Sequence, residues 1–305
     1  MTGDFMIYAA LNVAFVLLAS PLFMTIIKKV KAWAQGRKGP PLLQGYYNLA
    51  KLVKKETVYS PNSSWIMRTA PYVNISVMLV AALLVPIVMI PEPAYGMGSV
   101  ILFLYLLALG RFFMALAGLD AGSAFGGMGS SREMTISAII EPITIVVFAA
   151  MSFALGTANI YEMFAAAPAM PSLLPIAGAL FIILIVETSR VPVDNPETHL
   201  ELTMVHEAMM LEQSGRNLAL MEASHAVKQT LLMAFLINLF LPWGMAGPAG
   251  IIFGALAFLA KGVLLCVVIG AFESSVAKLR LFRLPSLFMA AFFLSALTVV
   301  MEIFA

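Results

Sequence analysis

The chain has 305 residues, of which 61% are hydrophobic and only 11% are charged, and its mean hydropathy is +0.96. These values lie far outside the range of soluble globular domains and predict an integral membrane protein. The formal net charge of +2 comes with no basic run interleaved with aromatic residues, so nucleic acid is not an expected partner. A single cysteine, Cys266, leaves no pair for a disulfide and no Cys-rich spacing for a zinc or iron–sulfur site.

Runs of roughly 20 apolar residues recur along the whole chain, and each is long enough to cross about 30 Å of hydrocarbon as a helix. They predict eight spans, at about 5–29, 70–91, 97–119, 135–157, 172–189, 226–244, 249–273 and 285–304. The sequence lacks the apolar–polar alternation of barrel strands, so the expected fold is an all-α, polytopic helical bundle. The first run lacks the basic start of a signal peptide and is predicted to be a retained span.

Lysines and arginines are distributed unevenly over the connections between these spans. Nine lie between the first two spans, whereas the connections after spans two, four and six contain none. The positive-inside rule then predicts that both termini face outward and that 17 of the 18 basic residues lie on the cytoplasmic side. The chain is therefore expected to be one membrane domain, 1–305, in the inner membrane of the cell, with cytoplasmic loops at about 30–69, 120–134, 190–225 and 274–284.

Ionisable side chains inside the predicted spans are candidates for function, because each costs about 2.5 to 3.5 kcal/mol on insertion scales. They are Arg111, Glu141, Glu187, Lys261 and Glu273. Glu141 precedes Pro142, whose missing N–H leaves a helix carbonyl free. Burial is expected to raise the pKa of such a carboxylate towards neutrality, so that it can exchange protons. The structural alternatives are a salt bridge between helices, for example between Arg111 and Glu141, and an interfacial side chain that reaches water.

The segment ETSRVPVDNPETHLEL, Glu187 to Leu202, is rich in carboxylates and ends the fifth predicted span. Asp194, Glu197 and Glu201 are spaced by three and four residues, which places them on one face if the chain is helical beyond Pro196. Like charges at that spacing favour shared protons and coupled titration. An ordinary solvated acidic loop remains the alternative.

Three histidines, His199, His206 and His225, raise the question of a metal site. His199 and His206 are seven residues apart and Glu207 is adjacent, but no HExxH or Cys-rich spacing is present, and such a pair is usually structural. Gly126, Gly127 and Gly129 make a glycine-rich segment before the fourth predicted span. They are expected to belong to a loop, where they serve flexibility or close backbone approach.

At these residues the chain resembles the eight-span membrane anchor subunit shared by respiratory complex I, where it is the first membrane subunit, and the energy-converting group 4 nickel–iron hydrogenases. The motifs are GRKGPPLLQGYYNLAKLVKKE (36–56), GLDAGSAFGGMGSSREMTISAIIEP (118–142), the 187–202 segment and AFESSVAKLRL (271–281). The forms RKGPPLLQ, GLDAGSAF and FESSVAKLRL resemble the hydrogenase and formate hydrogenlyase branch. Two positions depart from the quinone-reducing branch, with His199 and Asn48 standing where that branch typically has acids.

The resemblance implies a non-catalytic membrane anchor and coupling subunit that holds no cofactor or metal itself. The nickel–iron centre and the iron–sulfur clusters are expected in partners, namely the peripheral large and small hydrogenase subunits and an iron–sulfur subunit. Antiporter-like membrane subunits and lipids are the expected neighbours in the bilayer. The implied function links cytoplasmic electron transfer and hydrogen evolution to proton or sodium translocation. Alternatives are a quinone-binding membrane subunit of an NADH:quinone-type oxidoreductase and a stand-alone ion carrier, which the lack of an internal repeat disfavours.

For individual residues, the resemblance implies a proton path and a docking loop. Glu141, Glu187, Asp194, Glu197 and Glu201 are expected to form the inner end of a hydrated path, with Arg190 biasing their charge. Lys261 and Glu273 are further candidates for this path. Partner docking is expected at Arg37, Lys38, Gly39, Pro40, Gln44 and Arg132.

Overall fold

The computed structural model describes the whole chain except residues 1, 89–97, 167–170, 196–203, 245–249 and 305. The described part is helical, with one isolated bridge between Ser99 and Asn159. In chain order the elements are α1 Thr2–Ala34, α2 Gln44–Lys54, α3 Trp65–Leu84, α4 Val100–Asp120, α5 Ala124–Leu155, α6 Ile160–Ala166, η1 Pro171–Leu173, α7 Leu174–Glu187, α8 His206–Met210, α9 Gly215–Phe240, α10 Ile251–Ser275, η3 Leu281–Arg283 and α11 Leu284–Phe304. This confirms the all-α polytopic fold.

Six of the helices in the described ranges, α1, α3, α4, α5, α10 and α11, are long and apolar enough to cross a membrane. The other two predicted spans differ from that pattern. The helix α7 has only 14 residues, about 21 Å at 1.5 Å per residue, and η1 precedes it. The helix α9 has 26 residues but carries Lys228, Gln229 and Asn238 among its apolar residues. The count of eight equivalent spans is therefore not reproduced in full.

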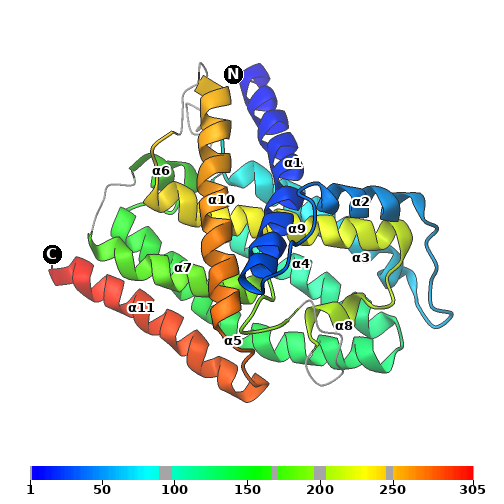
Figure 1. The fold of residues 1–305 in the computed structure, drawn as a ribbon. Coiled ribbons are helices and arrows are strands. Elements are labelled where there is room, and N and C mark those ends of the chain that lie inside the picture. Colours follow the sequence, from blue (N-terminus) through cyan, green and yellow to red (C-terminus); the bar gives the residue numbers. More distant parts are fainter. Residues whose placement is uncertain (1, 89–97, 167–170, 196–203, 245–249, 305) are drawn as a thin grey trace.

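The centre of the bundle is α9, which packs against α1, α2, α3, α6, α7 and α10. The helices α3, α4, α5, α11 and α7 follow one another as packed neighbours and form an elongated layer with α9. The pair α1 and α10 crosses this layer steeply (Figure 1). Polar residues of α9 are thus surrounded by other helices, which explains how a helix of mixed polarity is accommodated.

An aromatic cluster holds α4, α5 and α6 onto α9. The ring of Phe235 on α9 lies 5.0, 5.1 and 5.5 Å, centroid to centroid, from Phe103, Phe148 and Phe164. All four side chains are almost completely buried. Such tilted and edge-on pairs contribute about 0.5–1.5 kcal/mol each beyond their buried area, so this cluster fixes α9 within the layer.

The glycine-rich segment is helical, so the prediction that Gly126, Gly127 and Gly129 belong to a loop is wrong, whereas the cytoplasmic location of 120–134 stays a prediction. The helix α5 begins at Ala124, and the Ser123 hydroxyl caps it by accepting a bond from Gly126 N at 3.1 Å. A Cβ atom on Gly126 would stand only 2.3 Å from the carbonyl oxygen of Gly118 on α4. Close backbone approach, the other use expected of these glycines, is confirmed and explains why this helix starts early.

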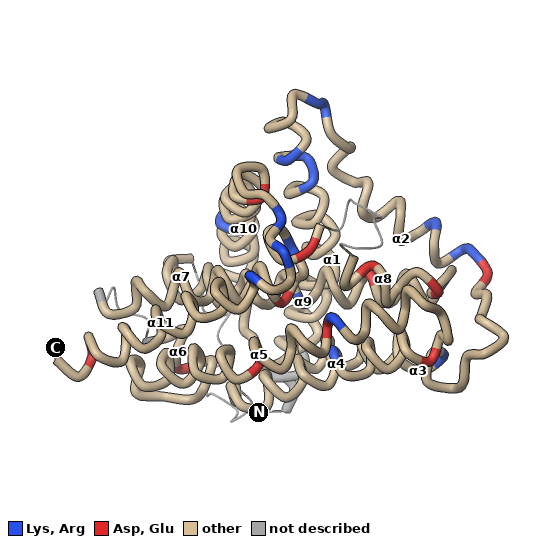
Figure 2. The backbone as a smooth tube through the Cα atoms, turned by 90° about the horizontal axis from the view of Figure 1, so that it is seen from below, with Lys and Arg blue, Asp and Glu red and all other residues tan. Residues whose placement is uncertain are grey.

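The other predicted loops also contain helical segments. The 30–69 region includes the end of α1, all of α2 and the start of α3, and the 190–225 region includes α8 and the start of α9. The 274–284 region is the shortest, joining α10 to α11 through η3. Lysines and arginines are frequent near α1 and α2 and sparse along α7 and α11 (Figure 2).

Candidate functional site

Arg111 is the centre of a buried group of charges between α4, α5 and α7. Its guanidinium is 5% exposed and donates to Glu187 at the end of α7 and to Glu141 on α5, the latter at 3.1 Å. It also donates to the Ser137 hydroxyl at 3.0 Å, and its Nε lies 3.7 Å from a Glu133 carboxylate oxygen. The predicted salt bridge between Arg111 and Glu141 is therefore present.

Glu187 and Glu141 sit in different surroundings although they share Arg111. The Glu187 carboxylate is only 2% exposed and also contacts Lys228 of α9 at 2.7 Å, so two cations hold it. The Glu141 side chain is 42% exposed. The burial that was expected for Glu141 is thus only partial.

A second group of charges surrounds Glu273 on α10, whose side chain is fully buried. Its two carboxylate oxygens contact Lys31 of α1 at 2.9 Å and Arg190 at 2.8 Å. Arg190 also donates to the side-chain oxygen of Gln229 at 3.1 Å. Gln229 and Lys228 are adjacent on α9, so this helix carries one partner of each group, although no ion pair among the described residues links the two groups. The two groups are together called the ion-pair network. Its members are Lys31, Arg111, Arg190 and Lys228 with Glu133, Glu141, Glu187 and Glu273.

Asp194 fixes the segment that follows α7. Its carboxylate contacts Lys278 at 2.7 Å and accepts hydrogen bonds from the backbone N–H groups of Val205 and His206, each at 3.1 Å. The backbone N–H of Leu279 also donates to the carbonyl oxygen of Pro192 at 2.9 Å. Residues 188–195 are therefore a largely buried segment with a fixed conformation, and not a solvated loop.

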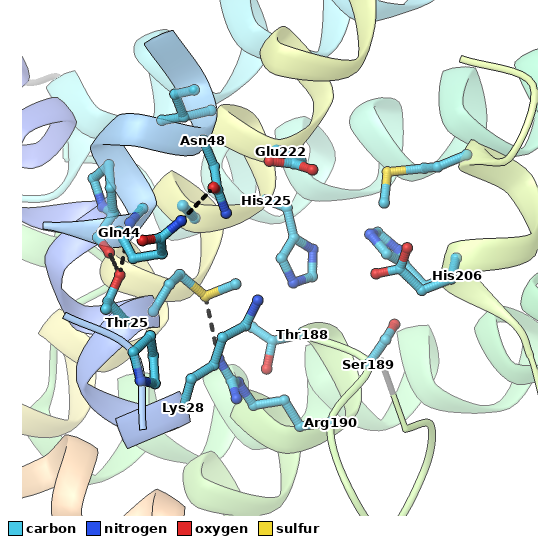
Figure 3. Close-up of a pocket in the computed structure, with 18 of the residues that line it drawn as sticks. Thr25, Lys28, Gln44, Asn48, Thr188, Ser189, Arg190, His206, Glu222 and His225 are labelled. Carbon is cyan, nitrogen blue, oxygen red and sulfur yellow. Dashed lines mark hydrogen bonds between the residues drawn. The ribbon is translucent and has the colours of Figure 1, made fainter. Parts of the chain in front are cut away.

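A cavity of about 300 Å³ lies between α1, α2, α8, α9 and this segment (Figure 3). Its wall combines apolar side chains with many polar and charged ones. The polar and charged ones include Lys28 and Thr25 from α1, Gln44 and Asn48 from α2, Thr188, Ser189 and Arg190 after α7, and His206, Glu222 and His225 from α8 and α9. Arg190 belongs to both the cavity wall and the ion-pair network, so the two features meet.

Two further spaces adjoin the network. A chamber of about 30 Å³ is lined by Arg111, Glu133, Glu187 and Lys228 together with His206 and His225, and this volume is sufficient for a water molecule. A groove of about 330 Å³ between α4 and α5 is lined by apolar residues and by Arg111, Glu141 and Glu187. Exposed Ile101, Tyr105 and Ile145 border this groove, so it opens on the apolar surface of the bundle.

The short helix α8 contributes two titratable groups with shifted pKa values. Burial, reinforced by Lys228 and opposed by Asp194, lowers the pKa of His206 to about 4. Burial, reinforced by Glu222 and opposed by Lys28, raises the pKa of Glu207 to about 7. Neutral pH thus leaves His206 uncharged and Glu207 partly protonated.

Several predicted site residues lie away from the network. Lys261 of α10 is buried and donates to the carbonyl oxygens of Leu241 and Trp243, which follow α9, at 2.8 and 2.9 Å. These bonds tie α10 to the C-terminal end of α9, where Leu241 is the C-cap residue. Glu197 and Glu201 lie outside the described residues, as does His199.

The residues predicted for partner docking divide into two sets. Arg37 and Lys38 are exposed, whereas Pro40 and Gln44 line the cavity and Gly39 packs close to Lys29 and Ala32 of α1. Arg132 donates to the carbonyl oxygen of Met204 at 2.8 Å. Arg132 thus ties α5 to the segment before α8.

Sequence reasoning missed Glu133 as a site residue, and it used Lys31 and Lys228 only as topology markers. Glu133, Ser137 and Glu141 are spaced i, i+4, i+8, which places all three on the face of α5 that meets Arg111. That pattern was readable from the sequence once the helix was known to start early. The partners of Lys31 and Lys228 were not readable, because they lie on distant helices.

Fold and site together define a polytopic helical membrane protein with a buried ion-pair network between a polar cavity and an apolar groove. Within the described ranges, no group of three or more His, Cys, Asp and Glu side chains is arranged to hold a metal ion. The family model described as NADH dehydrogenase matches residues 7–304, and the chain belongs to that family.

Among relatives, the chain is similar to "Hydrogenase-4 component C" of Escherichia coli (strain K12), 33% identical over 303 residues, covering 97% of this chain and 95% of the relative. It is also similar to "Formate hydrogenlyase subunit 4" of the same organism, 30% identical, with 94% and 95% covered. For "NADH-ubiquinone oxidoreductase chain 1" of Triticum aestivum, the identity is 28% and the coverage 76% and 71%.

The fold also matches a chain in the structure of the membrane-bound sulfane sulfur reductase, an archaeal respiratory membrane complex. The TM-score is 0.82 at 20% identity, and 98% of this chain and 99% of that chain are covered. Agreement over nearly the full length of both chains supports the arrangement of helices described above.

Proposed function

We propose that this chain is the membrane anchor and coupling subunit of a respiratory-type nickel–iron hydrogenase complex, linking electron transfer and hydrogen evolution to proton or sodium translocation. The observation that carries the proposal is the ion-pair network, whose two groups meet at α9, one reaching the cavity at Arg190 and the other reaching the groove at Glu141. Neighbouring titratable groups of this kind titrate together, so a change beside one group can shift a proton at the other.

The nearly full-length similarity to two Escherichia coli subunits, a component of hydrogenase-4 and a subunit of formate hydrogenlyase, supports the hydrogenase assignment. In the proposed complex, peripheral large and small hydrogenase subunits and an iron–sulfur subunit carry the nickel–iron centre and the clusters. They dock over the cavity, near exposed Arg37 and Lys38. Antiporter-like membrane subunits and lipids cover the apolar surface, including the groove that exposes Glu141.

The energy scale of this network suits coupling. Moving one charge against 100 mV costs about 2.3 kcal/mol, and a tenfold change in the proton affinity of a carboxylate corresponds to about 1.4 kcal/mol. Displacing one cation from Glu187, which is held by Arg111 and Lys228, therefore changes its proton affinity by an amount comparable with that cost. Glu141 shares Arg111 and responds with Glu187.

The orientation follows from the same proposal. The cavity, α2 and α8 face the cytoplasm, and both termini lie outside the inner membrane. A reporter that is active only in the cytoplasm, fused to the C-terminus, tests this directly and should be inactive. An active reporter would contradict the orientation.

The main test compares Glu187→Gln and Glu141→Gln in the intact complex reconstituted into vesicles. Removing either negative charge is expected to reduce the coupled ion gradient at least tenfold, because the network then holds an excess cation. Glu302→Gln at the far end of α11 is the matched control, since no ion pair within the described residues involves Glu302. Wild-type hydrogen evolution together with a wild-type gradient in both test variants would refute the proposal.

A quinone-binding membrane subunit is the second candidate, favoured by the cavity and by the similarity to NADH-ubiquinone oxidoreductase chain 1 over 76% of the chain. It predicts that quinone-site inhibitors block turnover of the purified complex. Hydrogen production from a soluble electron donor that is insensitive to these inhibitors would argue against it. Transport by the purified chain alone in liposomes would instead support a stand-alone carrier.

A further inference from the structure

His206 and His225 stand between two of the spaces described above. Both side chains line the cavity of about 300 Å³, and both also line the chamber of about 30 Å³. They come from separate elements, α8 and α9, and lie near each other at one wall of the cavity (Figure 3). The two imidazoles therefore form part of the partition between the cavity and the charges around Glu187.

The two rings are close enough to act as one titrating unit. Their centroids are 4.4 Å apart at an interplanar angle of 46°. A second positive charge at this separation would be strongly repelled, so the two rings accept at most one added proton at a time. Two imidazoles without a third ligand in the described part of the chain do not make a metal site.

His206 keeps one ring nitrogen available. Its Nε2 is shielded from solvent and has no hydrogen-bond partner among the residues that the structure describes. Its backbone N–H, by contrast, is held by Asp194 at 3.1 Å. The backbone of His206 is thus held in place, while the Nε2 atom of its ring has no hydrogen-bond partner among the described residues. A buried polar atom without a partner costs stability, and it is free to accept a proton.

Charged groups surround this pair on every side. Glu207 adjoins it on α8, and Glu222 and Lys228 are on α9. Lys28 of α1 and Arg190 and Asp194 of the segment after α7 are further neighbours. On the chamber side the charged groups are Arg111, Glu133 and Glu187. Burial lowers the pKa of His206 to about 4, so the ring is neutral near pH 7. A proton that it accepts is therefore readily released.

We propose that His206 and His225 form a proton gate that passes single protons between the cavity and the chamber beside Glu187. This inference rests on the proposed coupling function and deepens it. A proton moves from the cavity to a ring nitrogen of one histidine and gives an imidazolium. If the donor is water it becomes hydroxide, and if the donor is hydronium it becomes water. The imidazolium then releases a proton from a ring N–H, through water in the chamber, to the Glu133 carboxylate, and the neutral histidine is restored.

Glu133 is the acceptor that the geometry favours. It lines the chamber, and its nearest described cation contact is Arg111 Nε at 3.7 Å. Glu187 is held more tightly by Lys228 at 2.7 Å as well as by Arg111. A loosely paired carboxylate accepts a proton at lower cost than one held by two cations.

Chemical rescue tests the gate in the intact complex in vesicles. His206→Ala and His225→Ala are each expected to reduce the coupled gradient at least tenfold, since a positioned proton-transfer group typically contributes 10²- to 10⁴-fold. Added imidazole, which the cavity can admit, should restore the gradient. The pH dependence of the rescued gradient should shift when 4-methylimidazole replaces imidazole. Leu211→Ala, at an exposed position directly after α8, is the control and should neither lose the gradient nor respond to imidazole.

Other outcomes separate the gate from the coupling function. If both histidine variants keep the gradient while Glu187→Gln loses it, the gate is refuted and the proposed function stands. If Glu187→Gln and Glu141→Gln also keep it, both fail. Loss without rescue would overturn the gate in favour of a structural role. His206→Gln and His225→Gln serve where an alanine variant fails to assemble, and a wild-type gradient in these variants likewise refutes the gate.

Discussion

Replacing Glu273 with glutamine should loosen the packing of α1 against α10. The carboxylate is fully buried and contacts two cations, Lys31 at 2.9 Å and Arg190 at 2.8 Å, whose side chains are only 9% and 6% exposed. Glutamine keeps the size and one acceptor oxygen but removes the negative charge. Two buried cations are then left without the carboxylate that compensates them.

The magnitude follows from the cost of breaking a buried ion pair by removing one partner, about 3–5 kcal/mol. No discount for solvent screening applies, because Glu273 has no solvent-exposed side-chain surface. At about 1.4 kcal/mol per tenfold, opening of α1 from α10 should become roughly 150-fold to several thousand-fold more frequent. Lys31→Met added to Glu273→Gln should recover part of this loss, because one of the uncompensated charges is removed.

Cys266 provides the assay. It is the chain's single cysteine, lies on α10 two turns from Glu273, is fully buried, and its thiol contacts the Phe23 carbonyl oxygen of α1 at 3.7 Å. A maleimide therefore labels it only after α1 and α10 separate. The labelling rate of this chain, resolved from its partners on a gel, should rise in proportion to the opening equilibrium.

Glu56→Gln, at an exposed position in the predicted first loop, is the matched control and should alter the rate by roughly twofold at most. A labelling rate for Glu273→Gln within threefold of wild type, in a complex that assembles normally, would refute the reasoning that Glu273 holds these helices. Faster labelling in the Glu56 variant would show that the assay reports something other than α1–α10 separation.

Four further predictions concern other parts of the chain. Gly126→Ala should destabilise the protein by about 1–3 kcal/mol, because its Cβ would stand 2.3 Å from a carbonyl oxygen of α4. The Cβ of Gly127→Ala meets nothing within 4 Å, so this variant should be neutral or stabilising by up to about 1 kcal/mol. Thermal unfolding of both variants measures the difference. Folding lets Glu207 keep a proton between its ordinary pKa of 4.5 and about 7, so stability falls as pH rises through this window and Glu207→Gln should remove that slope. His206 has the opposite sign, with stability rising between about 4 and its ordinary pKa of 6.5, and His206→Gln should remove the rise in melting temperature over that range. Lys261→Met should lower thermal stability by about 1 kcal/mol through loss of its two bonds to carbonyl oxygens, yet leave the coupled gradient intact.

Much of the fold was predictable because apolar runs and helices coincide. The runs at about 97–119 and 285–304 correspond to α4 at Val100–Asp120 and α11 at Leu284–Phe304. The start of α5 was not, since glycines are ordinarily read as helix breakers and only contact with α4 shows why they are needed here. The length of α7 was also overestimated, because hydropathy does not distinguish η1 from the helix that follows it.

The candidate site was predictable in part: the charges inside the spans and the pairing of Arg111 with Glu141 were predicted, whereas Glu133 and the pairings of Lys31 and Lys228 were not. Glu141, Glu187 and Glu273 were identified because a charge within an apolar span needs a reason. Lys31 and Lys228 were read as markers of the cytoplasmic side, since a lysine near the end of a span usually reaches water. In the structure Lys31 is 7% exposed and contacts a carboxylate on α10. Sequence spacing carries no information on contacts between helices so far apart in the chain.

The contact between Lys31 and Glu273 also has a consequence for how the protein is made. The lysine belongs to the first helix and the glutamate to the last but one, so synthesis completes α1 long before its counter-charge exists. Until α10 enters the bilayer, α1 must keep Lys31 close to water or to an insertion factor. Integration of this chain therefore ends when α10 brings Glu273 into contact with Lys31. In pulse-chase labelling, a product truncated before Glu273 should be degraded rapidly, whereas one truncated after α10 should persist longer.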